Sequence, residues 1–144
     1  MKKILIILLF LFILGSVVAW YLFNMEFNKT QDLKADYKLS AIQLIQEFDK
    51  NNSASNKKYS DKIIQIEGDV NDIESADSSI NIKMTCPNTD SYVIFSFQSD
   101  NMTEAKKIKK SDQIIIRGSC SGGIYSEILE ANAISFKRCV IIKN

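Results

Sequence analysis

Residues 62–70 read KIIQIEGDV, a run in which apolar and polar side chains alternate. Continued to residue 74, the pattern places Ile64, Ile66 and Val70 on one face and charged or amide side chains on the other. Such alternation indicates a half-buried β-strand over residues 62–74. Gly68 falls on the apolar face in mid-strand, which predicts strong coiling or a bulge, as a small barrel needs where a strand turns a corner.

The same alternation predicts four more strands downstream. Residues 80–84 and 93–97 each carry apolar side chains at every second position, and the turn-rich residues 87–90 between them predict a hairpin. Residues 114–120 supply a fourth strand, and residues 134–142 supply the last. The stretch from Ser121 to Ala133 is expected to be the loop that connects these two strands.

Two helices are predicted beside the strands. Ser40 and Gln43 form an S-x-x-Q capping box, and the apolar side chains that follow at i, i+3, i+4 and i+7 form one stripe. This helix is expected to end within residues 51–56. A second, short helix is predicted over residues 102–109, with Asp100 or Asn101 as its cap and lysines in its last turn.

The predicted order is helix, three strands, helix, two strands. An OB-fold has this order, since it is a five-stranded Greek-key barrel with its helix between strands three and four. We therefore predict a mainly β domain over residues 37–144, a five-stranded OB-fold barrel with a leading α-helix and a short helix between strands 3 and 4.

The N-terminus predicts an attachment to the membrane. Lys2 and Lys3 precede an uncharged run over residues 4–23, long enough to span a bilayer as a helix. Lysines on this flank are expected to stay in the cytoplasm, so the rest of the chain is expected outside it. This interpretation gives a single-pass signal-anchor of the inner membrane at residues 1–23, a polar spacer at 24–36 and an extracytoplasmic domain.

A cleaved signal peptide is the alternative, with cleavage near Ala19 releasing the domain into the periplasm. The apolar run continues past that point through Trp20, Tyr21 and Phe23, which favours the uncleaved anchor because aromatic residues suit a membrane interface. A lipid anchor would need a cysteine soon after the run, and the first cysteine is Cys86.

Composition argues against catalysis and against strong electrostatic binding of nucleic acid. Lysine and arginine number 18 against 17 aspartate and glutamate, and histidine is absent. The chain thus lacks the commonest general base and the commonest transition-metal ligand. No clustered set of four zinc ligands is present. We expect no enzymatic activity, no cofactor and no metal.

Several stretches resemble the bacterial tRNA-anticodon-binding-like OB-fold family of small exported or membrane-anchored domains. They are residues 35–37 (ADY), 56–59 (NKKY), 62–70 (KIIQIEGDV), 118–122 (GSCSG) and 139–144 (CVIIKN). The resemblance covers roughly residues 35–144. It implies the OB-fold, and it supplies no catalytic residues to carry over.

OB-folds usually bind ligands across strands two and three, between the loops that join strands one to two and four to five. The candidate ligand-binding residues here are Lys83, Thr85, Tyr92 and Ile94, beside Ser121 and Tyr125. Both flanking loops carry acidic residues and no lysine or arginine, whereas single-strand binders combine an electropositive groove with stacking aromatics.

We therefore expect a binding or interaction module whose partner is another envelope protein. Nucleic acid is not the expected partner. The alternative is an OB-fold that recognises single-stranded nucleic acid or an oligosaccharide.

Two of the three cysteines match the cysteine positions of the family pattern. Cys120 and Cys139 fall in neighbouring predicted strands, and outside the cytoplasm such thiols can persist as a disulfide. The sequence leaves a Cys120–Cys139 disulfide and two buried reduced thiols both open, with the disulfide as the preferred interpretation. Cys86 is expected to be a small buried residue at a strand end.

Overall fold

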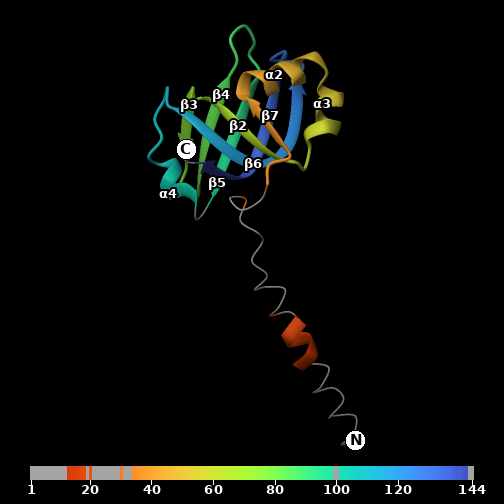
Figure 1. Cartoon of the computed structure of the whole chain (residues 1–144), viewed down its shortest axis with the longest axis vertical. Coiled ribbons are helices and arrows are strands. Elements are labelled where there is room, and N and C mark those ends of the chain that lie inside the picture. The colour runs from red at the N-terminus through yellow and green to blue at the C-terminus, as the bar shows by residue number, and fades with distance from the viewer. Residues whose placement is uncertain (1–12, 19, 21–29, 31–33, 99–100, 143–144) are drawn as a thin grey trace, which may run out of the picture.

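The computed structural model describes residues 13–18, 20, 30, 34–98 and 101–142. Its central feature is one curved β-sheet (Figure 1). In chain order the elements of the domain are β1 (Tyr37–Ser40), α2 (Ala41–Lys50), α3 (Asn52–Tyr59), β2 (Ile63–Asp69), β3 (Asp72–Ser75), β4 (Ser79–Thr85), β5 (Tyr92–Gln98), α4 (Met102–Ala105), β6 (Gln113–Ser126) and β7 (Ala131–Ile142).

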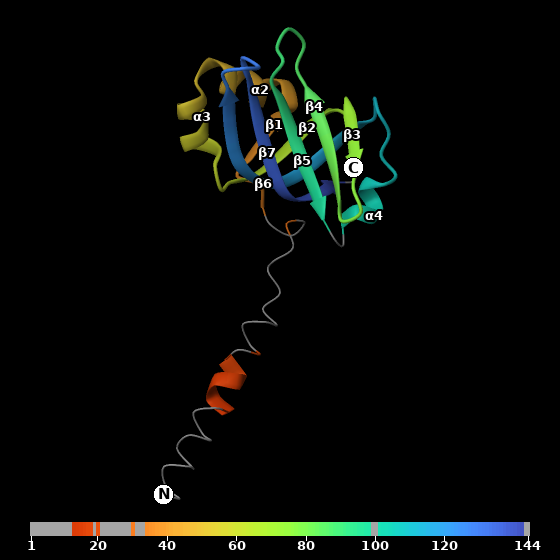
Figure 2. The same ribbon diagram turned by 180° about the vertical axis from the view of Figure 1, so that it is seen from behind.

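The seven strands lie in the order β1-β2-β6-β7-β5-β4-β3. The β1–β2 and β5–β7 pairs are parallel, and the other neighbours are antiparallel. Figure 2 shows the same sheet from behind, with the long strands β6 and β7 curving across it. Two register shifts in the β6–β7 pair, at Arg117/Ser119 and at Cys120/Gly122, accompany this curvature.

The predicted first strand is divided into β2 and β3, and only Val70 and Asn71 separate them. At this junction the hydrogen bonds change sides. The Val70 N–H donates to the Asp112 carbonyl beside β6, whereas the Asn71 N–H donates to the Lys83 carbonyl of β4, both at 2.9 Å. The two halves therefore pair toward opposite ends of the strand order.

The prediction of a closed five-stranded barrel is thus correct only in its class. The domain is mainly β and its sheet is strongly curved. The sheet has seven strands, however, and its hydrogen-bonded ladder is not closed. Division of the first strand adds one strand. The other addition is β1, whose four residues pair in parallel with β2 ahead of the helix.

Helix α2 begins and ends as the sequence predicts. The Ser40 side chain accepts a hydrogen bond from the Gln43 N–H at 3.1 Å, and the helix ends at Lys50. Its apolar stripe is buried at Ala41, Leu44, Ile45 and Phe48. The rest of the core comes from alternate residues of the strands, chiefly Ile64, Ile66, Ile80, Ile82, Met84, Val93, Phe95, Phe97, Ile116, Ile134 and Phe136.

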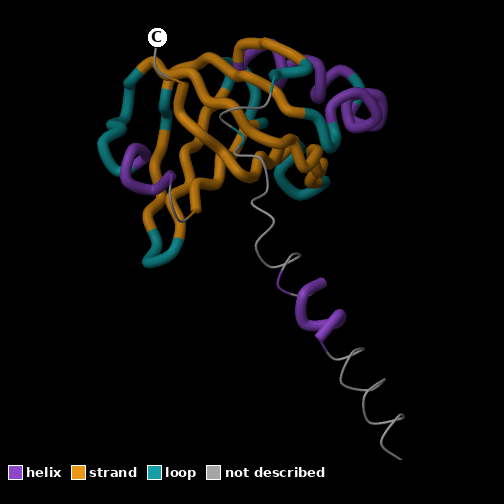
Figure 3. The backbone as a smooth tube through the Cα atoms, turned by 60° about the horizontal axis from the view of Figure 1, so that its bottom comes forward, coloured by secondary structure: helices purple, strands orange, loops and turns teal. Residues whose placement is uncertain are grey.

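The other two helices differ from the predictions. Residues 52–59 form a separate helix, α3, where only the end of the first helix was expected. Helix α4 ends at Ala105, so the predicted helix over residues 102–109 is too long. In the tube view of Figure 3, the α2–α3 pair and α4 lie toward opposite sides of the sheet.

Most of the predicted anchor at residues 4–23 lies outside the described residues. Within the ranges that are described, no helix combines the length and the apolar character needed to cross a bilayer. The anchor and the boundaries at residues 23 and 36 therefore stay predictions.

Candidate interaction site

Four of the predicted site residues lie together on the outer surface of β4 and β5. The strand register places Lys83 opposite Ile94 and Thr85 opposite Tyr92. Because successive side chains of a strand point to opposite faces, these four point outward while their neighbours fill the core. The Lys83 Nζ lies 4.0 Å from the centre of the Tyr92 ring, a cation–π contact. We call these four residues the β4–β5 face.

The edge beside this face is acidic. Asp72 of β3 lies opposite Lys83 in the register and also pairs with Lys110 at 2.6 Å. The hydrogen bond from Lys110 is the largest cause that holds the pKa of Asp72 below its ordinary value. Lys110, which follows α4 in the chain, thus forms an ion pair at this edge. The β4–β5 face therefore has no strong surplus of positive charge.

The other two predicted site residues lie elsewhere. Strand β6 continues to Ser126, so the predicted loop over residues 121–133 shrinks to a tight turn at residues 127–130. Ser121 is exposed at the bulge between Cys120 and Gly122. Tyr125 lies opposite Asn132, whereas its neighbour Ile124 lies opposite Ala133, which in turn pairs with Tyr92.

Alternation along the strand then decides which of these side chains meets the β4–β5 face. Ile124 is in the row of Ala133 and Tyr92, so it belongs to that face. Tyr125, one residue later, points to the other side of the sheet. Of the predicted stretch from Ser121 to Tyr125, the register therefore places Ile124 beside Tyr92 and Tyr125 on the other side of the sheet.

The end of the β6–β7 hairpin exposes four large apolar side chains, of which the sequence analysis singled out only Tyr125. Ile124, Tyr125, Ile128 and Leu129 expose 77%, 50%, 94% and 60% of their surfaces. We call these four residues the hairpin tip. The available signal was the apolar pair Ile-Leu inside a stretch expected to be a polar loop. Exposed apolar groups gathered in one place mark sites of contact more often than scattered ones do.

Helix α3 holds the base of this hairpin through asparagine side chains. The Asn56 Oδ1 accepts a hydrogen bond from the Gly123 N–H at 2.8 Å, and its Nδ2 donates to the Gly123 carbonyl at 2.8 Å. The Asn52 Nδ2 donates to the same carbonyl at 3.0 Å and to the Asn132 Oδ1 at 2.7 Å. Both strands of the hairpin are thereby tied to one helix.

The network continues into α2 and into the start of β5. The Asp49 Oδ1 accepts hydrogen bonds from the Ser91 hydroxyl at 2.6 Å and from the Asn132 Nδ2 at 2.9 Å. The Ser91 hydroxyl in turn accepts from the Asn132 N–H at 2.8 Å. Because these groups satisfy one another, the hairpin base is fixed and the tip projects from a rigid support.

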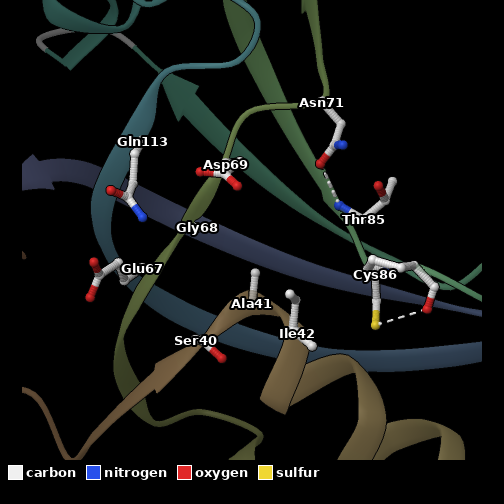
Figure 4. A pocket seen from close by; sticks show the side chains of 11 residues that line it. Ser40, Ala41, Ile42, Glu67, Gly68, Asp69, Asn71, Thr85, Cys86 and Gln113 are labelled. Carbon is white, nitrogen blue, oxygen red and sulfur yellow. Dashed lines mark hydrogen bonds between the residues drawn. The ribbon is translucent and has the colours of Figure 1, made fainter.

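A pocket of about 440 Å³ lies at the beginning of α2, between β2 and the end of β4 (Figure 4). Glu67, Asp69 and Gln113 surround one side of it, and the Cys86 thiol lies on the other, donating to the Pro87 carbonyl at 3.4 Å. Over the described ranges, no group of three or more metal-ligating side chains is close enough to hold an ion. The pocket thus presents carboxylate, amide and thiol groups.

A charged cluster joins the two N-terminal helices. The Glu47 Oε2 accepts hydrogen bonds from the Lys58 Nζ at 2.9 Å and from the Tyr59 hydroxyl at 2.7 Å. The hydrogen bond from Lys58 is the main cause that lowers the pKa of Glu47. Burial raises the pKa of Tyr59, whose side chain is fully covered. The cluster lies between helices and is structural.

The predicted disulfide is absent from the structure, in which Cys86, Cys120 and Cys139 are all buried free thiols. The reason is register. Cys120 lies opposite Phe136. Cys139 lies beside Gly118, at the register shift between Arg117 and Ser119, and a Cβ added to Gly118 would lie 2.9 Å from the Cys139 Sγ. Burial raises the pKa of both Cys120 and Cys139, so neither is disposed to react as a thiolate. The prediction that Cys86 is buried is confirmed.

Comparison with known proteins supports the fold. One solved structure, from Klebsiella pneumoniae subsp. pneumoniae MGH 78578, bears the name "putative nucleic acid-binding lipoprotein". It is 18% identical to this chain, covers 73% of this chain and 91% of its own length, and superposes with a TM-score of 0.58. At this identity the likeness establishes the fold alone. No curated protein matches the chain.

A protein family also matches the chain by sequence. It is named tRNA_anti-like, and it matches residues 1–131. The match includes the N-terminal residues and most of the OB-fold-like domain, and it agrees with the resemblance carried by residues 62–70 and 118–122. This chain belongs to the tRNA_anti-like family.

Proposed function

We propose that this protein is an interaction module of the cell envelope that binds another protein through the hairpin tip. The observation that carries the proposal is the exposure of four large apolar side chains on a hairpin whose base is held by the asparagine network. Burial of such a cluster against a partner is favourable because it removes apolar surface from water. A rigid support lowers the cost of ordering the tip on binding.

The charges around the tip indicate the chemistry of the partner. Glu127 and Glu130 flank the apolar pair Ile128 and Leu129, and residues 121–133 contain no lysine or arginine. Complementary potentials favour a partner with an apolar socket whose rim is basic. The same acids disfavour insertion of the tip into an anionic lipid surface, so a protein is the preferred occupant.

The envelope is the proposed location. The apolar run at residues 4–23 behind Lys2 and Lys3 supports a single-pass anchor in the inner membrane with the domain outside the cytoplasm. A structural neighbour that is named a lipoprotein supports an envelope location as well. The alternative is a periplasmic protein released by cleavage near Ala19. Binding without catalysis is part of the proposal, and the absence of histidine supports it.

Site-specific photocrosslinking in cells tests the proposal. A photoreactive amino acid replaces Ile128, and the matched control places the same group at Ile42, an apolar residue of α2 that is 44% exposed. We expect a discrete protein adduct from position 128 and none of the same mass from position 42. The adduct should disappear when Leu129→Ser and Tyr125→Ser are introduced. Equal adducts from both positions, or none from position 128, would exclude the hairpin tip as a contact.

A second candidate function is binding of single-stranded nucleic acid on the β4–β5 face. The contact between Lys83 and the Tyr92 ring favours it, and the neighbouring protein's name mentions nucleic acid. A stacking aromatic contributes about 1–3 kcal/mol per base. If this function holds, single-stranded RNA should bind with an affinity that falls with salt and that Lys83→Glu and Tyr92→Ala remove. If the protein contact is the function, these variants should leave the crosslink at position 128 unchanged.

A further inference from the structure

A second hollow, of about 430 Å³, lies on the side of the sheet away from the β4–β5 face. It is bounded by the end of α2, the beginning of α3, the turn at Asn88 and Thr89, and the base of the β6–β7 hairpin. Its volume lies within the range of sites that accept small molecules. The hollow shares Tyr125 with the hairpin tip, and its other lining residues belong neither to the tip nor to the β4–β5 face.

Fixed hydrogen-bonding groups form the wall of this hollow. Asp49, Asn52 and Asn132 belong to the network under the hairpin, so their side-chain positions are set before a ligand arrives. Both hydrogen bonds that Asp49 accepts within the described residues use Oδ1, which leaves Oδ2 for a ligand hydroxyl. Preorganised carboxylate and amide groups of this kind suit a ligand that carries many hydroxyl groups.

An aromatic ring completes the hollow. Tyr125 lies along its edge and is half exposed, and the buried ring of Phe48 contributes to its floor. One face of a pyranose ring is apolar, and it packs well against an aromatic side chain, while the ring's hydroxyl groups reach the polar wall. The combination of one exposed aromatic ring with carboxylate and amide groups is the chemistry of saccharide recognition.

The charges of the lining exclude a strongly anionic ligand. Asp49 and Glu130 contribute two carboxylates, against the single ammonium of Lys50. A phosphate or a nucleic-acid backbone would meet a net negative site. The turns on both sides are closed by residues in the left-handed region, Asn88 at φ 70° and Glu130 at φ 49°, so the rim has a defined shape. From the wall, the ring and the charge, we propose that this hollow binds an uncharged saccharide.

Saturation-transfer NMR with the full chain tests the proposal, with chitotriose and maltotriose as probes. The expected result is transfer to at least one of them, with a dissociation constant in the millimolar range that is typical of a small, shallow site. Tyr125→Ala should weaken binding by about tenfold, the loss expected when an aromatic contact is removed. Ile42→Ala, a control at an exposed apolar residue that does not line the hollow, should leave binding unchanged.

Failure of the saccharide site and failure of the protein contact are distinguishable. Ile128→Ser removes an apolar residue of the hairpin tip that does not line the hollow, so it should abolish the protein contact and keep saccharide binding. If Tyr125→Ala does not fold, as shown by its thermal melt, Glu130→Gln tests the same rim without loss of a ring. Absence of transfer from both probes, or equal losses from Ile42→Ala and Tyr125→Ala, would overturn the saccharide site.

Discussion

At the scale of single residues, Gly123 has too little room for a side chain. A Cβ at this position would lie 2.6 and 2.7 Å from two carbons of the Phe48 ring and 3.2 Å from Ile134. Its N–H and carbonyl are also bound by Asn56. Any side chain must therefore displace a core aromatic ring or separate the hairpin from α3.

We predict that Gly123→Ala lowers the free energy of unfolding by about 1–3 kcal/mol, the usual cost of overpacking a filled core. Urea denaturation monitored by circular dichroism measures this change. Gly15→Ala is the matched control, since no atom lies within 4 Å of the Cβ it would add, and it should leave the midpoint unchanged. A midpoint for Gly123→Ala equal to that of the native sequence would show that Phe48 moves without cost.

Glu47 makes stability depend on pH. Its pKa is lowered in the folded state, mainly by the hydrogen bond from Lys58. The stability that this interaction adds is fully present above the pKa of glutamate in the unfolded chain, and it is lost as the pH falls through the lower folded value. We predict that Glu47→Gln removes this part of the acid-induced loss.

Urea denaturation midpoints measured from neutral pH to below the ordinary glutamate pKa of about 4.3 test this prediction. The native chain should lose more stability over this range than Glu47→Gln does. Glu127→Gln, an exposed residue of the hairpin turn, serves as the control and should follow the native curve. Parallel curves for the native chain and Glu47→Gln would mean that the Lys58 contact adds nothing in solution.

At the scale of elements, α3 shows what sequence periodicity cannot reveal. Its residues read NSASNKKY and carry no apolar stripe. The helix forms because the Asn51 side chain caps it, accepting from the Ala54 N–H at 3.0 Å, and because Asn52 and Asn56 bind the distant Gly123. A helix that is fixed by contacts about seventy residues away leaves only a weak local signal. By contrast, α2 has both a capping box and a stripe, and its extent was predicted correctly.

We predict that Asn56→Ala lowers the free energy of unfolding by about 1–3 kcal/mol, because it leaves the Gly123 N–H without its hydrogen-bond acceptor. Ser53→Ala, on the exposed part of the same helix, is the control and should change stability little. Hydrogen exchange at the Gly123 amide provides an independent readout and should become faster in Asn56→Ala only. Unchanged exchange at that amide would contradict the role given to Asn56.

The strands were predicted well and their connections poorly, for one physical reason. Alternation reports which face of a strand is buried, so the apolar faces of β4, β5 and the first half of β6 were correct. It does not report where a ladder stops. Strand β6 therefore continues past the bulge at Ser121, and the long loop expected between the last two strands is a short turn. The position of Tyr125 on the other side of the sheet follows from this extension.

The register of the β6–β7 pair decides the state of the cysteines. It puts Cys139 beside Gly118 and Cys120 opposite Phe136, so the two thiols do not face each other. We predict that the purified protein has the intact mass of the fully reduced chain. We also predict that iodoacetamide labels Cys120 and Cys139 only after denaturation, because both side chains are fully buried. A peptide linked through these two residues would show that the oxidised chain adopts another register.

At the scale of the whole molecule, the family was predictable and the partner was not. The run KIIQIEGDV carries information about the fold, because the curved sheet requires both its alternation and its glycine. The apolar residues of the hairpin tip meet no such demand, since each of them exposes half or more of its surface. A sequence pattern that reflects folding therefore gives no information about the residues of the hairpin tip.

The proposed anchor predicts the behaviour of the intact chain in a Gram-negative host. Full-length protein should remain with the membrane fraction, and protease added to spheroplasts should degrade the domain. Mass spectrometry of the retained fragment then locates the end of the protected segment near residue 23. Soluble protein that begins near Trp20 would instead establish cleavage, and a domain protected from the protease would place it in the cytoplasm.

The pairing of β2 with the distant β6 bears on how fast this molecule folds. The antiparallel partner of β2 is β6, which follows it by about fifty residues, with four other elements between them. Contacts between such distant segments make folding slow, on the order of milliseconds to seconds for comparable β domains. Until β6 is in place, β2 presents a bare row of backbone donors and acceptors. The newly made chain is therefore most exposed to strand exchange and aggregation in the interval before its second half is complete.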